Sequence, residues 1–159
     1  GAPWEVDFVP FALNPDWDAP DNLLALMAGV VVRDRRPEQF LRAHLALFAA
    51  RHDHGADLRK EDVIAAALQS VGVPADDVVS EIRTGRPLQV VRKAHEEEAS
   101  TRGVFGVPTF ILGTRAVFVR IMTRPEGDVA RARKTIEMVV DLIGNHPELN
   151  EFKATTIDQ

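Results

Sequence analysis

The stretch Gly-Val-Phe-Gly-Val-Pro-Thr-Phe-Ile-Leu, residues 103–112, decides the fold, because it places a proline at the mouth of an apolar strand. Proline has no N–H to give to a β ladder, so it is confined to strand starts, edges and bulges. Pro108 therefore leaves the backbone of Val107 unpaired and able to hydrogen-bond an extended ligand. The residues alone leave two interpretations open, a plain strand start and a cis Val107–Pro108 bond, and trans bonds are the commoner.

The residues that follow this proline predict a β-hairpin. Residues 107–112 form the first expected strand and residues 115–122 the second. Between them, Gly113-Thr114 suits a two-residue turn with glycine in its first position. Because apolar side chains occur on both faces of these strands, we expect a sheet that is covered on both sides.

The start of the chain also predicts a strand. Residues 4–9 alternate with a period of two, which is typical of a half-buried strand. Prolines then interrupt residues 11–21, which we expect to form an irregular loop. Phe11 and Trp17 within this loop predict that it packs against the protein rather than extending into solvent.

Helical periodicity fills most of the remaining chain. Glycines at 72, 85 and 144 are expected to end helices, since glycine is the usual residue just past a helix C-terminus. The expected helices cover residues 22–32, a segment starting at Pro37, residues 61–71 and 75–84, a segment starting at Pro87, and residues 128–143 with Asp128 as N-cap.

Three segments together resemble one family. The pattern Gly-x-x-Gly-Val-Pro-Thr-Phe at residues 103–110 resembles the cis-proline loop of DsbA-like thioredoxin-fold proteins. Residues 4–15 (WEVDFVPFALNP) are similar to the family's second strand and the loop that leaves it. Residues 147–153 (PELNEFK) resemble the tail of bacterial, in particular actinobacterial, members.

This resemblance implies an α/β fold, in which a thioredoxin-like sheet carries a helical insertion. It implies one domain over residues 1–159, with residues 1–20 and 101–159 in the thioredoxin-like core and residues 21–100 in the insertion. The family's first strand and helix would precede this chain. A sheet of three strands would leave an edge open, and open edges invite pairing. If the chain is complete as it stands, we therefore expect a homodimer or a partner protein.

The chain departs from the family in one respect, because it contains no cysteine. Family oxidoreductases carry a Cys-x-x-Cys motif, or a variant with serine, after the first strand. The resemblance implies a thiol–disulfide oxidoreductase in which Val107, Pro108 and Thr109 line the substrate site. Thiol–disulfide exchange requires a thiolate, so these residues bind an extended peptide or small thiol but do not catalyse exchange, and no catalytic residue is assigned.

Two alternatives stay open. The first is an isomerase or transferase of the same fold that depends on a low-molecular-weight thiol, glutathione or mycothiol, as its cofactor. The second is a non-catalytic interaction domain that keeps the loop as a docking surface. Enzyme activity as an oxidoreductase depends on an active-site segment upstream of Gly1.

Composition excludes several other classes of protein. The net charge of −5 argues against a nucleic-acid binder, which would show a basic footprint. No apolar run approaches the roughly 20 residues of a membrane span. The chain opens without a signal peptide, so we expect a cytoplasmic location.

Other candidate chemistry is weak. His52 and His54 are two residues apart and do not share a helix face, so we expect a solvated helix end and no metal site. His95 lies on the apolar side of its helix and is either a local acid or base or, as we favour, a hydrogen-bonded structural residue. Arg115 and Arg120 offer charge to an anionic thiol or carboxylate, although surface ion pairs are the simpler interpretation.

Overall fold

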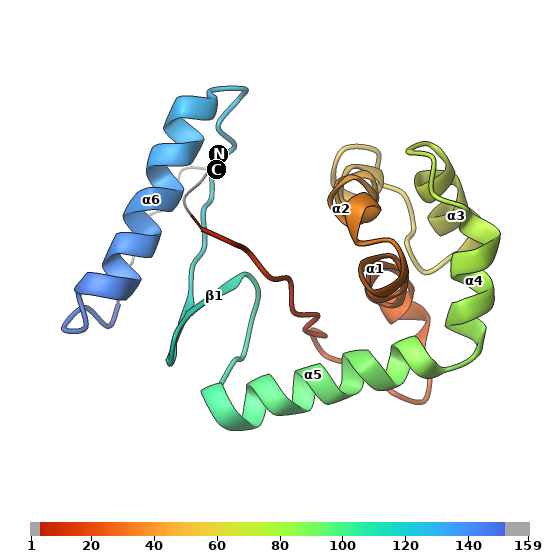
Figure 1. Cartoon of the computed structure of the whole chain (residues 1–159), viewed down its shortest axis with the longest axis horizontal. Coiled ribbons are helices and arrows are strands. Elements are labelled where there is room, and N and C mark those ends of the chain that lie inside the picture. The colour runs from red at the N-terminus through yellow and green to blue at the C-terminus, as the bar shows by residue number, and fades with distance from the viewer. Residues whose placement is uncertain (1–3, 152–159) are drawn as a thin grey trace. The chain divides into compact units, whose positions relative to one another are not determined.

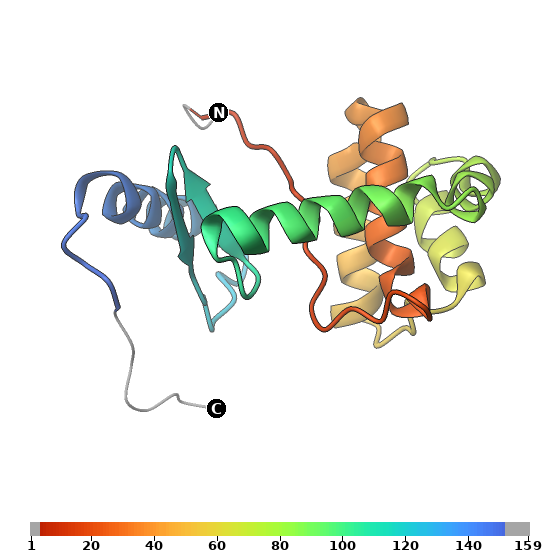
Figure 2. The same ribbon diagram turned by 90° about the horizontal axis from the view of Figure 1, so that it is seen from below.

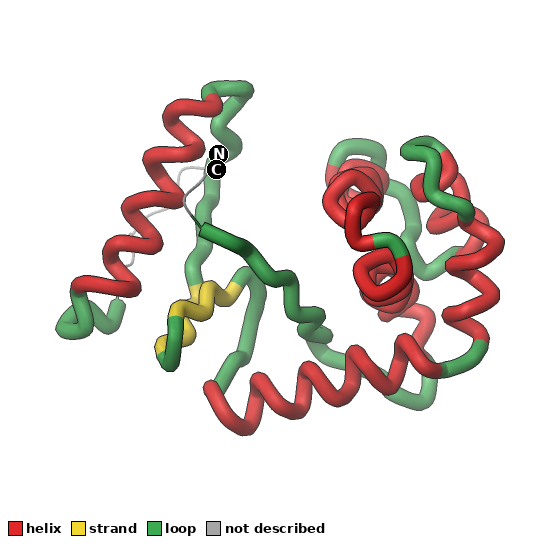
Figure 3. Tube along the Cα trace, in the orientation of Figure 1, coloured by secondary structure: helices red, strands yellow, loops and turns green. Residues whose placement is uncertain are grey.

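A computed structural model describes residues 4–151 and separates the chain into two compact units, Gly1–Thr101 and Arg102–Gln159. The chain is mostly helical with a small two-stranded antiparallel sheet (Figures 1 and 3). Among the described residues, no helix is both long and apolar enough to cross a bilayer. The elements in chain order are the 3-10 helix η1 (Pro20–Leu23), α1 (Leu24–Arg35), α2 (Pro37–His52), α3 (Glu61–Gln69), α4 (Ala75–Arg83), α5 (Arg86–Arg102), β1 (Thr109–Leu112), β2 (Arg115–Phe118) and α6 (Val129–Asn145).

The helices of the first unit follow the predicted positions. Pro37 is the first residue of α2, where its missing N–H costs no helical hydrogen bond. Gly72 and Gly85 follow α3 and α4 with φ angles of 73° and 78°, a conformation that glycine adopts without strain. The expected helix ends at these two glycines are confirmed.

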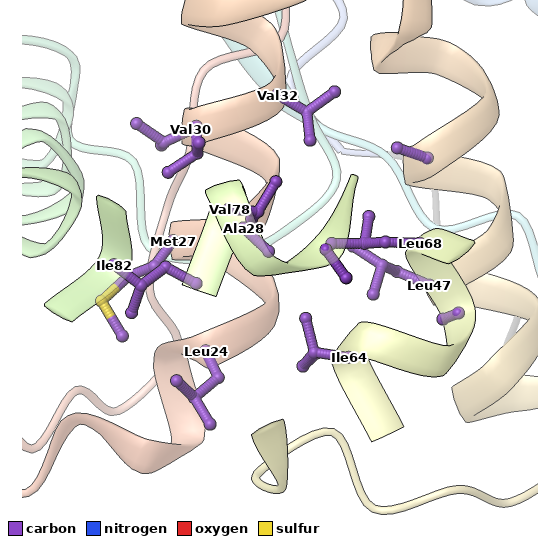
Figure 4. Close-up of a cluster of buried hydrophobic side chains, with 14 of the residues drawn as sticks. Leu24, Met27, Ala28, Val30, Val32, Leu47, Ile64, Leu68, Val78 and Ile82 are labelled. Atoms are coloured by element: carbon purple, nitrogen blue, oxygen red, sulfur yellow. The ribbon is translucent and has the colours of Figure 1, made fainter. Parts of the chain in front are cut away.

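The core of the first unit is centred on α1, which packs against α2, α3 and α4. Valines at 30, 31 and 32 are all buried, so this helix is apolar around most of its circumference. Such a helix is stable only when neighbours surround it. Figure 4 shows side chains from α1 meeting Leu47 of α2, Leu68 of α3 and Val78 of α4.

The expected strand at residues 4–9 is wrong. These residues run without regular structure, and no strand pairs with them in the described part of the chain. They are held by the helical unit instead, because Arg33 Nη1 donates a 3.2 Å hydrogen bond to the carbonyl oxygen of Phe8. The Phe8 ring also lies 5.3 Å from the Phe40 ring. An alternating sequence makes a strand only where a neighbour accepts its backbone hydrogen bonds.

In the second unit, the predicted hairpin forms with shorter strands than expected. β1 and β2 pair antiparallel with Leu112 opposite Arg115, which leaves Gly113-Thr114 as the two-residue turn. Gly113 has a φ of 60°, as the turn requires. No residue of either strand is buried, so the expectation of a sheet covered on both faces is wrong for the described residues. The observed two strands also replace the expected three.

Helix α6 lies beside β1 in the second unit (Figure 2). The Asp128 side chain accepts a 2.9 Å hydrogen bond from the Arg131 amide, which confirms the predicted N-cap. The prediction that Gly144 ends the helix is wrong, because α6 continues to Asn145. A Cβ at Gly144 would lie 3.2 Å from Leu112 Cδ2, so this glycine makes room for a side chain of β1.

An ion-pair network joins three helices of the first unit. Arg86 of α5 donates to Asp34 of α1 at 2.8 Å and to Glu81 of α4. Burial raises the pKa of Asp34, but hydrogen bonds from Arg86 and Arg33 outweigh it and hold that pKa below the ordinary 3.8. The hydrogen bond from Arg86 is the largest influence on Glu81 and lowers its pKa below 4.5.

We expect Arg86→Gln to be less stable than the wild type at about pH 7 and to approach wild-type stability at about pH 3. Carboxylates with lowered pKa values stabilise the fold above their ordinary pKa, and this contribution is lost as the pH falls through the lowered value. Urea unfolding of both proteins at each pH measures the difference. The control is Arg83→Gln, which removes a single ion pair to Glu61 and should lower stability less. A constant difference between Arg86→Gln and wild type across this pH range would contradict the account.

Candidate functional site

The proline loop, defined as residues 106–109, is fixed by two hydrogen bonds within the second unit. The Val107–Pro108 peptide bond is cis, so the second of the two interpretations of this bond is the one observed. The Thr109 hydroxyl donates a 2.7 Å hydrogen bond back to the carbonyl oxygen of Gly106. The carbonyl oxygen of Pro108 accepts a 3.1 Å hydrogen bond from the amide of Val119. The first bond ties the loop to the start of β1, and the second ties it to the residue that follows β2.

The register of the hairpin shows which backbone groups face away from β2. Antiparallel partners alternate between hydrogen-bonded and non-hydrogen-bonded pairs. The turn makes Leu112 and Arg115 a bonded pair, so Thr109 and Ile111 occupy non-bonded positions and direct their N–H and C=O groups to the outer edge. Among the described residues, β2 is the one strand that pairs with β1. Its outer edge therefore offers backbone donors and acceptors.

Val107 extends this edge. Its backbone makes no hydrogen bond within the described residues, and 44% of the residue is exposed. The expected unpaired backbone at this position is therefore present. Pro108 is exposed and Thr109 is half-buried, so the three predicted residues lie next to each other on one accessible border of the hairpin.

Two aromatic rings, those of Phe105 and Phe118, lie next to the proline loop. Phe105 is 76% exposed, and its ring lies 5.3 Å from the ring of Phe118 on β2. A Cβ at Gly106 would lie 3.1 Å from Phe118 Cε2, which is closer than most Cβ contacts, so a side chain at this position requires the Phe118 ring to shift. Sequence reasoning missed Phe105 as part of the site. The signal was an aromatic residue directly before the second glycine of the motif.

The comparison with family models identifies the fold family. The model described as DSBA-like thioredoxin domain matches residues 5–123, which include the proline loop and both strands. The chain belongs to this family. Among curated proteins, none matches the sequence significantly. The resemblance of residues 103–110 and of residues 4–15 to DsbA-like proteins is thus confirmed. Residues 147–153 lie beyond the matched range, and residues 152 and 153 also lie outside the described part of the chain, so that resemblance stays a prediction.

The DSBA-like domain contains no cysteine, so it has no redox Cys-x-x-Cys motif within its 159 residues. No titratable side chain occurs among residues 106–109. The loop therefore offers backbone hydrogen bonds, a hydroxyl and apolar contact, and it has no group that attacks a disulfide.

His95 of the DSBA-like domain lies in the first unit, on α5. Its half-buried ring lies 4.4 Å from the ring of Phe11 and 5.6 Å from that of Trp17. Arg92 lies over the Trp17 ring at 5.0 Å, which confirms that the loop at 11–21 packs through its aromatic residues. The ring is structural in its packing, but the expected hydrogen bond is missing at Nδ1, which has no partner among the described residues.

The remaining candidate residues serve local structure. Arg115 Nη1 donates to the carbonyl oxygen of Ile143 near the end of α6, and Arg120 lies 5.6 Å from the centre of the Phe118 ring. His52 and His54 are exposed. Within the described residues, no group of three or more histidine, cysteine or acidic residues is placed to hold a metal ion.

Proposed function

We propose that this domain is the substrate-binding part of a thiol–disulfide oxidoreductase. The observation that carries the proposal is the exposed backbone of Val107, which makes no hydrogen bond within the described residues at the end of an open strand edge. An extended peptide adds to such an edge through main-chain hydrogen bonds, while side-chain contacts give selectivity. Family membership supports the reaction class, and the geometry supports the mode of binding.

In this proposal each residue of the loop has one role. Val107 exchanges backbone hydrogen bonds with the substrate, and the substrate continues along Thr109 and Ile111. Pro108 blocks ladder pairing at its own nitrogen and so ends the protein's own strand. The Thr109 hydroxyl is occupied by Gly106, so it holds the loop in shape. The thiolate comes from a segment beyond these 159 residues or from a thiol ligand.

Phe105 extends the contact surface beyond the backbone. Its exposed ring and the half-exposed side chain of Val107 form an apolar rim beside the edge. A substrate residue next to the reacting cysteine therefore meets an aromatic surface. We infer a preference for apolar side chains at that position of the substrate.

The parent peptide for this test is unstructured and has one cysteine flanked by valine and threonine. One variant is N-methylated on the backbone at its odd-numbered residues and the other at its even-numbered residues. The two variants should differ in affinity for the domain. A strand added to an edge donates alternate N–H groups. One variant should therefore lose at least two hydrogen bonds of about 0.5–1.5 kcal/mol each, a loss of about tenfold or more in affinity, and the other should bind nearly as the parent does.

Isothermal titration calorimetry of the three peptides measures these affinities, and glutathione and mycothiol are titrated in parallel. Equal affinity of the two methylated variants would contradict strand addition at this edge. Saturable heat with either thiol and none with the parent peptide would favour the thiol-dependent isomerase or transferase. Peptide binding by a full-length protein that does not reduce insulin disulfides would favour an interaction domain.

A further inference from the structure

Helix α2 carries a row of apolar side chains on its solvent face. Leu41, Leu45 and Phe48 are 56%, 59% and 53% exposed. They are spaced by four and three residues, so they lie along one line of the helix. Glu38 precedes the row by three residues and His52 follows it by four, and both are exposed. This line is called the α2 seam below.

The α2 seam lies on the side of α2 that faces away from the core. The opposite side of α2 already contributes Ala43 and Leu47 to the core of the first unit. A helix that is apolar on two sides is normally covered on two sides. Phe8, which is 40% exposed, lies 5.2 Å from the ring of His44 and widens the apolar surface beside the seam.

Charge changes sign along α2. The first turn carries Glu38, and the last turn carries Arg51 and His52. Within the described residues, neither Glu38 nor Arg51 takes part in an ion pair. Arg42, which is also exposed, lies one turn after Glu38. A second helix laid along the seam therefore meets Glu38 at one end and Arg51 at the other, with the leucines and the phenylalanine of the seam between them.

We propose that the α2 seam binds the α2 seam of a second copy of this chain in an antiparallel pair. Leu45 is the midpoint between Glu38 and His52, so it lies at the two-fold axis. Antiparallel pairing places Glu38 of each copy beside the partner copy's basic last turn, whereas parallel pairing opposes like charges. Reversed helices also place opposite ends of their dipoles together.

A second copy fits this surface because an isologous contact makes one patch its own complement. A helix of uniform charge would match one end of the seam and be repelled by the other. A reversed α2 carries the required sequence of charges, with apolar residues at its centre. The pairing covers Leu41, Leu45 and Phe48 of both copies, which is the hydrophobic centre that dimer interfaces need.

Sedimentation over a range of protein concentrations tests the proposal with the full chain. We expect a monomer–dimer equilibrium, and we expect Leu45→Glu to weaken dimerisation about tenfold or more by opposing two carboxylates at the axis. Glu38→Arg and Arg51→Glu should each weaken it several-fold, and the double reversal should restore it. Met138→Glu on α6, where the side chain is also 56% exposed, is the matched control and should not change it.

A cross-linking measurement covers the case in which a charged variant fails to fold. Because the chain has no cysteine, Leu45→Cys introduces a single thiol. Copper–phenanthroline oxidation should link two such chains at concentrations where Met138→Cys stays monomeric. Any one of four results would overturn the proposal. The first two are a wild type that is monomeric at all concentrations and a Leu45→Glu variant that dimerises as the wild type does. The other two are failure of the double reversal to restore dimerisation and equal cross-linking of the cysteines at positions 45 and 138.

Discussion

Leu68→Ala is expected to lower the free energy of unfolding by about 2–5 kcal/mol. Leu68 has no exposed surface and lies among Leu47, Ile64 and Val78, so its removal leaves a cavity that rigid neighbouring helices fill only in part (Figure 4). Urea unfolding followed by far-UV circular dichroism measures the change, because most of the signal comes from the helices of the first unit.

The control for this substitution is Leu13→Ala. Leu13 loses the same atoms but is 51% exposed, so we expect a change within about 0.5 kcal/mol. Equal losses for the two variants would show that α3 does not pack against α1 and α2 as described. A loss confined to Leu68→Ala agrees with one core centred on α1.

Gly106→Val is expected to destabilise the hairpin by about 1–3 kcal/mol and to lower peptide affinity about tenfold. The added Cβ would lie 3.1 Å and 3.3 Å from two carbons of the Phe118 ring, and the two methyl groups need further space. Phe118 is paired with Thr109, so moving it shifts the strand edge that we propose as the peptide-binding edge. Amide hydrogen exchange at β1 and β2 and a peptide titration measure the two effects.

Gly29→Ala is the matched glycine control. A Cβ at Gly29 meets the Phe40 ring at 4.0 Å, which is an ordinary contact. Because Gly29 lies inside α1, alanine should gain about 0.5–1 kcal/mol from helix propensity. If the Gly106→Val variant has the amide hydrogen exchange rates and the peptide affinity of the wild type, the close approach of the loop to Phe118 is contradicted.

Much of the first unit was predictable because its signals are local. Pro37, Gly72 and Gly85 mark helix ends through backbone conformation alone, and apolar spacing identifies the buried faces. The Val30–Val32 run weakens the apolar periodicity of α1, since a helix buried on several sides is apolar around most of its circumference. A helix was nevertheless predicted at residues 22–32, and α1 continues beyond that range to Arg35.

The errors concern elements that depend on distant partners. The alternation at residues 4–9 suits a strand, yet a strand needs a neighbour, and this segment packs on Phe40 and His44 instead. Gly144 lies inside α6, where its missing Cβ leaves room for the Leu112 side chain of β1. Phe105 escaped notice because its role comes from a contact with Phe118 across the hairpin. The proline loop was predictable from sequence because the backbone constraints of proline and glycine do not depend on distant partners.

The most direct test of peptide binding is an amide-resolved NMR titration of the domain with the cysteine-containing peptide. We expect the amide resonances of Val107, Thr109 and Ile111 to shift on binding and these amides to gain protection from hydrogen exchange. The outward amides of β2, at Ala116 and Phe118, face the other edge of the hairpin and should change little. If saturating peptide shifts the amide resonances of β2, or leaves that of Val107 unchanged, the claim that the proline loop is the binding edge is contradicted.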